Sequence, residues 1–162
     1  MRLISLLALL TLVFSTAATA QNGPVTLTAA SHTVRTGETV CLNISATGLQ
    51  RMLSMQYSLQ WDPKVLAFSG VTGFKLPFLT KENFGTQVAS SGTLTCMWID
   101  NNLKGVTLPD GSALYQVCFK VVGKSGSTSS LKFVSKPTPF EAVNYQERLV
   151  LLRGKPGTIT VK

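Results

Sequence analysis

The sequence predicts an all-β fold, an antiparallel sandwich or barrel of about nine strands. Short runs of alternating apolar and polar residues recur along the chain, and Gly, Pro, Asn, Asp and Ser break them. Beyond the first twenty residues no apolar stripe of helical period has useful length. Alternation of this kind is typical of strands with one face in a core and the other in water.

The first half of the chain contains the clearest strand. Its predicted strands cover residues 25–29, 39–45, 53–61 and 66–71. In the third, one face carries Leu53, Met55, Tyr57, Leu59 and Trp61, and the other carries Ser54, Gln56, Ser58 and Gln60. Asp62 and Pro63 follow as the cap and first position of a short helical turn.

The second half repeats the pattern of short strands and polar turns. An irregular or briefly helical crossing loop over 75–83 leads into a hairpin of 84–89 with 93–99. A long loop over 101–110 follows, ending in the turn sequence Pro109-Asp110-Gly111. The remaining predicted strands cover 112–122, 131–135, 140–144, 149–152 and 158–161. No internal repeat or linker divides them, so residues 21–162 are expected to form one domain.

The N-terminal segment has the pattern of a signal peptide over residues 1–20. Arg2 precedes an apolar run from Leu3 to Phe14, and small residues lead to Ala20. The apolar run is shorter than the roughly 20 residues that a membrane-spanning helix needs. We therefore expect cleavage after Ala20, no membrane span thereafter, and a secreted protein, extracellular or at the cell surface.

The charge of the mature chain is positive but spread out. Without Arg2, 14 basic residues stand against 7 acidic ones. The basic residues lie in different segments, with no basic cluster and no aromatic-interleaved basic strand. Nucleic-acid binding needs a concentrated patch, so no nucleic-acid partner is predicted. Attraction to acidic cell-surface polymers stays open.

The sequence offers no catalytic set. His32 is the single histidine and lies in a polar stretch, and no G-x-S-x-G motif is present. Of the seven acids, Asp62 is explained as a cap and Asp110 as a turn residue, and the others have no paired spacing. Metal-binding motifs are absent too. We predict a protein that is not an enzyme and that has no cofactor and no metal ion.

Three segments resemble the cohesin domain family, in the family's order. They are Val34-Arg-Thr-Gly-Glu-Thr-Val40, Met55-Gln-Tyr-Ser-Leu-Gln-Trp-Asp-Pro-Lys-Val-Leu66 and Pro109-Asp-Gly-Ser-Ala-Leu-Tyr-Gln-Val-Cys-Phe-Lys-Val121. The resemblance implies a nine-stranded jelly-roll β-sandwich without catalytic activity. It also implies docking of a dockerin-type or other protein partner, in extracellular polysaccharide degradation or surface assembly.

The resemblance implies a docking face as well, on the sheet that holds the third, fifth, sixth and eighth strands. The outward residues carried over are Ser54, Gln56, Ser58, Gln60, Thr86, Val88, Thr95, Met97 and Ile99. This set consists of Gln, Ser, Thr and apolar residues, whereas studied cohesins often present acidic and Asn residues on this face. In the opposite phase of the strand over 93–99, Met97 and Ile99 would face the core. We favour Cys96 and Trp98 inside, because burial of Trp stabilises most.

The family topology places residues 39–45 beside the strand at 112–122. It therefore implies a cross-strand disulfide between Cys41 and Cys118, with Cys96 left as a buried free thiol.

Two other functions stay open. A carbohydrate-binding module on the same fold would need exposed flat aromatic side chains. The candidates are Trp61, Trp98, Tyr57, Tyr115 and Tyr145, and most have a phase that points inward. The other is a structural domain of an adhesin that has no ligand of its own.

Overall fold

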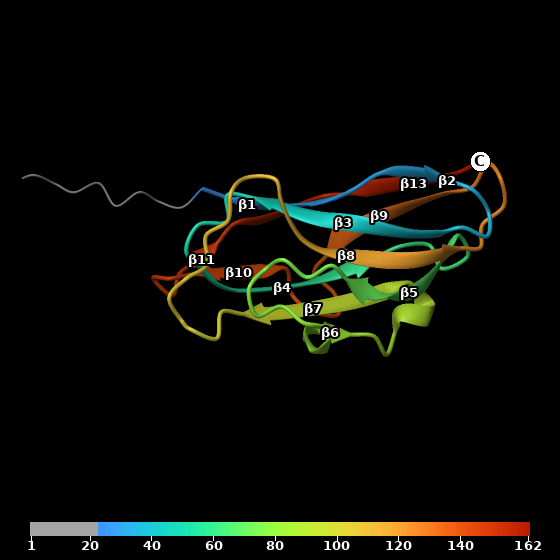
Figure 1. The fold of residues 1–162 in the computed structure, drawn as a ribbon. Helices are drawn as coiled ribbons and strands as arrows, with labels where there is room; N and C mark the ends of the chain where they lie inside the picture. The colour runs from blue at the N-terminus through green and yellow to red at the C-terminus, as the bar shows by residue number, and fades with distance from the viewer. Residues whose placement is uncertain (1–22) are drawn as a thin grey trace, which may run out of the picture.

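The computed structural model describes residues 23–162, which form two stacked β-sheets (Figure 1). The predicted signal peptide at 1–20 lies outside the described residues. The first sheet has the order β12-β1-β3-β8-β5. Its strands are β1 (Val25–Ala29), β3 (Thr39–Thr47), β5 (Leu66–Thr72), β8 (Ser112–Val121) and β12 (Leu152–Lys155).

The second sheet is organised around the central strand β4. Its strands are β2 (His32–Val34), β4 (Met52–Gln60), β6 (Phe84–Gly85), β7 (Thr93–Ile99), β9 (Thr128–Val134), β10 (Glu141–Asn144), β11 (Leu149–Val150) and β13 (Gly157–Val161). β7 pairs with one edge of β4 and with β6. Along the other edge of β4, β10 pairs with the first half of the strand and β9 with the second half. The all-β sandwich is confirmed, with thirteen short strands in the described chain rather than about nine.

The core lies between the two sheets and uses the predicted faces. Met55, Tyr57 and Leu59 of β4 are buried. Trp61 is buried too, and its indole Nε1 donates to the backbone oxygen of Leu66 at 2.9 Å. The alternation of β4 therefore predicts its inward side correctly from Met55 onward. At the start of the strand it is wrong, since Met52 is fully buried and Leu53 only partly, where the pairing with β10 shifts register.

Three elements differ from the predicted ones. The strand predicted over 149–152 is divided between β11 in the second sheet and β12 in the first. The strand predicted over 84–89 ends at Gly85, and a turn with a 3₁₀ segment, η2 (Ala89–Ser91), follows. This turn closes at Gly92, whose φ of 83° favours glycine and where a Cβ would lie 2.4 Å from the backbone oxygen of Trp61. β2 was not predicted, because three residues are too few to show alternation.

The chain passes from the first sheet to the second between β1 and β2 and again between β12 and β13, and these two crossings lie side by side. β1 pairs in parallel with β12 in the first sheet, and β2 pairs in parallel with β13 in the second. At the crossing, a Cβ on Gly157 would lie 2.3 Å from the backbone oxygen of Ala30. Only glycine allows the two crossing segments to approach so closely.

A disulfide bond joins Cys41 and Cys118, the pair that the resemblance implied. The two cysteines are direct partners in the β3–β8 ladder, with 4.0 Å between their Cα atoms. Cys96 is a buried free thiol. Within residues 23–162 no helix is long and apolar enough to cross a membrane.

Candidate functional site

The outer surface of β11, β10, β4 and β7 presents two rows of side chains, which we call the outer face. Directly opposite residues of paired strands project to the same side of a sheet. One row runs from Leu149 of β11 through Val143 and Ser54 to Ile99. The next row places Gln56 between Glu141 and Met97, and Thr95 lies farther along β7.

The outer face is rich in exposed aliphatic groups. Leu149 is 74% exposed, Met97 60% and Ile99 52%. Cys96 and Trp98, between and beside them on β7, are buried, so the favoured phase of this strand is confirmed. A shallow hollow of about 270 Å³ lies across the face and is lined by Ser54, Gln56, Met97, Ile99, Glu141 and Val143, with the inward-facing Met55 and Trp98 at its floor.

Hydrogen bonds from a neighbouring loop hold β7 in place. The indole Nε1 of Trp98 donates to the backbone oxygen of Pro77 at 2.7 Å. The side-chain amide of Asn83, in the 3₁₀ segment η1 (Lys81–Asn83), donates to the backbone oxygen of Met97 at 2.9 Å. These two contacts fix the strand that carries Met97. One involves the inward-facing side chain of Trp98, and the other the strand's own backbone at Met97.

One polar pair lies within the aliphatic rows. The amide Nε2 of Gln56 donates to the Glu141 carboxylate at 2.9 Å and ties β4 to β10. Glu141 is exposed and Gln56 partly so. The pair therefore offers a partner one fixed carboxylate surrounded by apolar groups.

Five of the carried-over residues lie together on the outer face: Ser54, Gln56, Thr95, Met97 and Ile99. The prediction that Ser58 faces solvent is wrong, since this residue is fully buried. Its hydroxyl accepts the backbone N–H of Thr138 at 3.0 Å, and donates to the oxygen of the same residue. The segment between β9 and β10 covers this part of β4.

The other three carried-over residues lie away from these five. Gln60 is exposed and pairs with Thr93 and Lys132, at the far end of β4. Thr86 and Val88 are exposed in the turn that replaces the predicted strand. Thr86 lines a separate hollow of about 500 Å³ beside β5.

Sequence reasoning missed three residues of the outer face: Glu141, Val143 and Leu149. The strand at 140–144 was predicted, but its pairing with β4 was not, so its outward residues were left out. The alternation of buried Ala142 and Asn144 with outward Glu141 and Val143 is visible in the sequence once β10 is placed beside β4.

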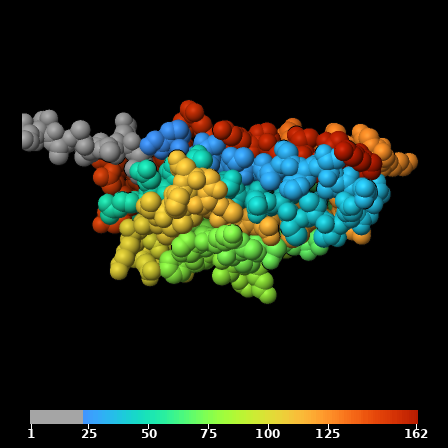
Figure 2. Space-filling view, turned by 45° about the horizontal axis from the view of Figure 1, so that its top comes forward, coloured from blue at the N-terminus to red at the C-terminus, as the bar shows by residue number. Residues whose placement is uncertain are grey.

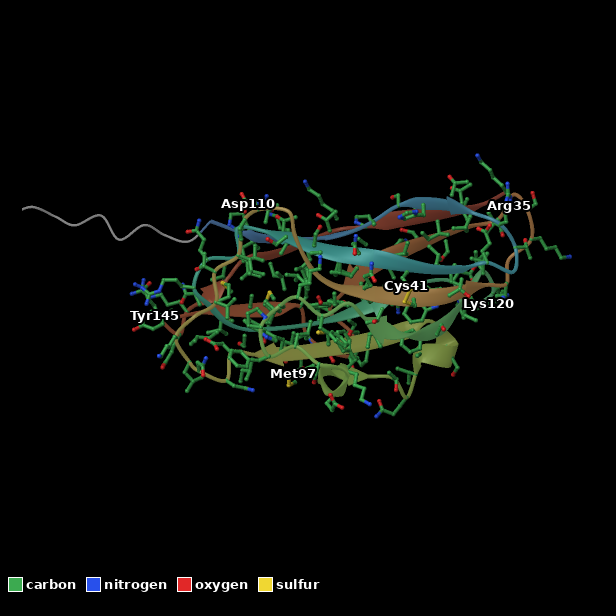
Figure 3. All side chains as sticks on the ribbon, viewed as in Figure 1. Arg35, Cys41, Met97, Asp110, Lys120 and Tyr145 are labelled. Atoms are coloured by element: carbon green, nitrogen blue, oxygen red, sulfur yellow. A yellow bond between two sulfur atoms is a disulfide. The ribbon has the colours of Figure 1, made fainter. Side chains whose placement is uncertain are left out.

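The aromatic candidates for sugar binding lie mostly in the core. Tyr57 and Tyr115 are buried and their hydroxyls meet at 3.1 Å between the sheets. Burial raises the pKa of both phenols well above the ordinary value. Tyr145, at one end of the sandwich (Figure 3), is 43% exposed, but the guanidinium of Arg51 lies over its ring, 3.6 Å from the centroid. The candidate set therefore offers no bare aromatic platform.

The acidic side chains hold loops. The Asp100 carboxylate is buried and accepts backbone N–H groups from Asn102, Lys104 and Gly105 at 2.8 to 3.0 Å. Asp62 accepts the N–H of Lys64, and Asp110 that of Gly48. Each carboxylate thus has a structural task that accounts for its position.

The free thiol of Cys96 is buried and is held in its protonated form. Burial raises the pKa of Cys96 to about 12, although a hydrogen bond with Tyr57 acts in the opposite direction. In the part of the chain that the structure describes, no group of three or more His, Cys, Asp or Glu residues could hold a metal ion.

Comparison with known proteins identifies relatives of this fold. The family model described as Cohesin domain matches residues 24–150. No curated protein matches the chain.

Several solved structures are similar over most of the chain. A type I cohesin–dockerin complex from Clostridium thermocellum matches with a TM-score of 0.73 at 10% identity, covering 86% of this chain and 100% of that one. The solution structure of a Clostridium acetobutylicum protein, CaCohA2, gives 0.71 at 14% identity, with 88% and 93% covered. A non-cellulosomal cohesin from Archaeoglobus fulgidus gives 0.66 at 19% identity, with 86% and 92% covered. At these identities the likeness shows the fold.

Proposed function

The chain belongs to the cohesin domain family, and from that membership we propose that its outer face docks a dockerin-type protein module. Cohesin domains are non-catalytic binding modules, and several of the similar solved structures are complexes with dockerins. We place the protein outside the cell or at its surface, in polysaccharide degradation or surface assembly. The disulfide between Cys41 and Cys118 supports an oxidising compartment.

The observation that carries the proposal is the set of exposed aliphatic side chains in the two rows of the outer face. Met97, Ile99 and Leu149 are each more than half exposed although aliphatic. A contiguous apolar area with polar neighbours on a folded domain is typical of an interaction surface. Since β7 is fixed by Asn83 and Trp98, the face is ordered before a partner arrives, which lowers the cost of binding.

The face also indicates how recognition would work. Aliphatic anchors would be buried against apolar side chains of the partner, in the manner of the central residues of other protein interfaces. The Glu141 carboxylate, held by Gln56, would accept a hydrogen bond from the partner and set its orientation. Affinity would thus come mainly from apolar burial, and specificity from the one polar pair.

A calorimetric titration with purified dockerin modules of the source organism tests the proposal. We expect the double variant Met97→Asp, Ile99→Asp to weaken binding at least 100-fold, because two carboxylates would be desolvated in the interface. The matched control is Thr39→Asp, Thr47→Asp, which places the same charges at exposed positions of β3 in the opposite sheet. This control should bind within about 2-fold of the parent.

Two outcomes contradict the proposal. Equal weakening by both double variants would mean that charge, and not the outer face, controls binding. Retention on a polysaccharide gel with no affinity for any dockerin module would favour the carbohydrate-binding function. Thermal unfolding of each variant confirms that it is folded before its affinity is compared.

A further inference from the structure

The fold gathers basic side chains that are scattered in the sequence. Arg35 and Lys120 lie at one end of the sandwich, opposite the end that carries Asp110 and Tyr145 (Figure 3). Lys64 and Lys124 join them from two other turns. We call these four exposed side chains the basic end.

Backbone hydrogen bonds bring the turns together. The N–H of Gly123 donates to the oxygen of Val65 at 3.0 Å, which joins the β8–β9 turn to the β4–β5 turn. The N–H of Lys162 donates to the oxygen of Val34 at 2.8 Å, beside the β2–β3 turn. Figure 2 shows the segments near residue 35 (blue), near residue 125 (orange) and the last residues (red) at the same end of the molecule.

The charge of the basic end is not neutralised there. Its acidic neighbours are Glu38 and Asp62, and each carboxylate accepts a backbone N–H of its own turn at 2.8 Å. Lys120 donates to the backbone oxygen of Gly37. Within residues 23–162 the one ion pair joins Lys81 to Glu82, which lie beside β7. With exposed Lys162, which lies at the same end, five basic side chains therefore stand against two acidic ones.

The opposite end has balanced charge. Its loops carry three basic residues and three acidic ones: Arg51, Lys104, Arg148, Asp100, Asp110 and Glu147. The two ends differ although they are built from loops of similar kind. Positive potential is therefore concentrated at one end of the molecule.

We propose that the basic end binds an anionic polysaccharide, and does so independently of the outer face. A flexible polymer with an anion on each repeat can reach cations on three separate turns, which a single small anion cannot. Val122 is the one exposed large apolar residue between β8 and β9, so this turn has little to insert into a lipid surface. The large aromatic side chains that are exposed, Phe74, Phe78 and Tyr145, lie in other loops, so bases of a nucleic acid find no stacking partner.

Affinity electrophoresis in gels containing polygalacturonate tests the inference, with dextran as the neutral polymer. The variant Arg35→Gln, Lys64→Gln, Lys124→Gln removes three charges whose side chains make no described hydrogen bond or ion pair. The matched control Lys104→Gln, Arg148→Gln, Arg153→Gln removes the same charge elsewhere. We expect at least a 10-fold rise in the dissociation constant for the first variant, less than 2-fold for the control, and no retardation by dextran.

Any one of three other results would overturn the inference. Equal weakening by both triple variants would assign the retardation to net charge alone. Binding to phosphatidylglycerol vesicles with no binding to polygalacturonate would assign the basic end to a lipid surface. Retardation of the parent by dextran would show that anions are not needed. Dockerin titration of the first triple variant keeps this test separate from the docking proposal, since its dockerin affinity should be unchanged.

Discussion

The free thiol of Cys96 lies beside a buried pair of phenols. The hydroxyls of Tyr57 and Tyr115 meet at 3.1 Å across the interface of the two sheets, and Tyr57 also hydrogen-bonds to Cys96. All three groups are held in their neutral forms by burial, which raises their pKa values. The folded state therefore resists ionisation at a point where the unfolded chain does not.

We predict that stability falls above pH 9 and that Cys96 causes the first part of the fall. The pKa of Cys96 is about 12 in the folded protein against an ordinary value of 9.0. Its stabilising contribution is complete below pH 9 and is lost as the pH rises toward 12, at up to about 1.4 kcal/mol per pH unit. Denaturant unfolding at pH 7, 9 and 10 measures this loss.

The matched variant is Cys96→Ala. It loses packing at every pH, but between pH 9 and 10 its stability should fall less steeply than that of the parent. Tyr57 and Tyr115 contribute mainly above their ordinary value of 10.0 and remain in both proteins. Identical slopes would show that the thiol ionises as easily in the fold as in the unfolded chain.

Residue-level prediction from the sequence succeeds where alternation decides and fails where a distant segment intervenes. The inward side of β4 follows from period-2 patterning, and the phase of β7 follows from the expected burial of Trp98. Ser58 has the outward phase of β4, yet it is buried because Thr138, 80 residues away, bonds to it. No local pattern around Ser58 contains that contact, so the outer face is shorter than the sequence suggests.

At the level of elements, β3 and β8 form the best-defined pair of the first sheet. Their register places Cys41 opposite Cys118, and a bulge lies between Ile44 and Ser45. The long alternating runs that form these strands were predicted. The short strands β2, β6 and β11 were not predicted as such, because their two or three residues pair through neighbours that only the fold supplies.

We predict that the disulfide contributes strongly to stability. It closes a loop with a sequence separation of 77 residues, which corresponds to roughly 4 kcal/mol in the chain-entropy account. The double variant Cys41→Ala, Cys118→Ala should lower the free energy of unfolding by an amount in that range. Denaturant unfolding of parent and variant provides the comparison.

Thiol titration of the unfolded, unreduced parent provides the control for this prediction. It should give one thiol, from Cys96. Three thiols would show that Cys41 and Cys118 are not bonded, and an unchanged unfolding free energy in the double variant would show that the bond adds no stability.

At the level of the whole molecule, the two proposed surfaces differ in physical character. The outer face is built around aliphatic side chains, with Glu141 as its fixed charge. The basic end consists of cations from three turns and of Lys120 on β8. The sequence predicts most of the outer face through alternation and resemblance. The basic end cannot be predicted from the sequence, because Arg35, Lys64 and Lys124 are far apart in the chain and come to one end only through tertiary structure.

We predict that salt separates the two binding events. Raising NaCl from 50 mM to 500 mM should weaken polygalacturonate binding at least 10-fold, because salt screens exposed charges. Dockerin binding should change less than 3-fold over the same range, since apolar burial dominates it. Titrations at both salt concentrations measure the two responses. Similar salt dependence in the two titrations would contradict the assignment of different forces to the two surfaces.

The parallel crossing of β1–β2 beside β12–β13 bears on how this module transmits mechanical tension. The described chain starts at one end of the sandwich and finishes at the other (Figure 1). Pulling on the two ends directs force along β1 and β13, which lie within the ladders β1–β12 and β2–β13. The hydrogen bonds of each ladder are then loaded together in shear, and they do not break one after another from one end. We therefore expect the topology that closes the two layers to resist unfolding under tension as well.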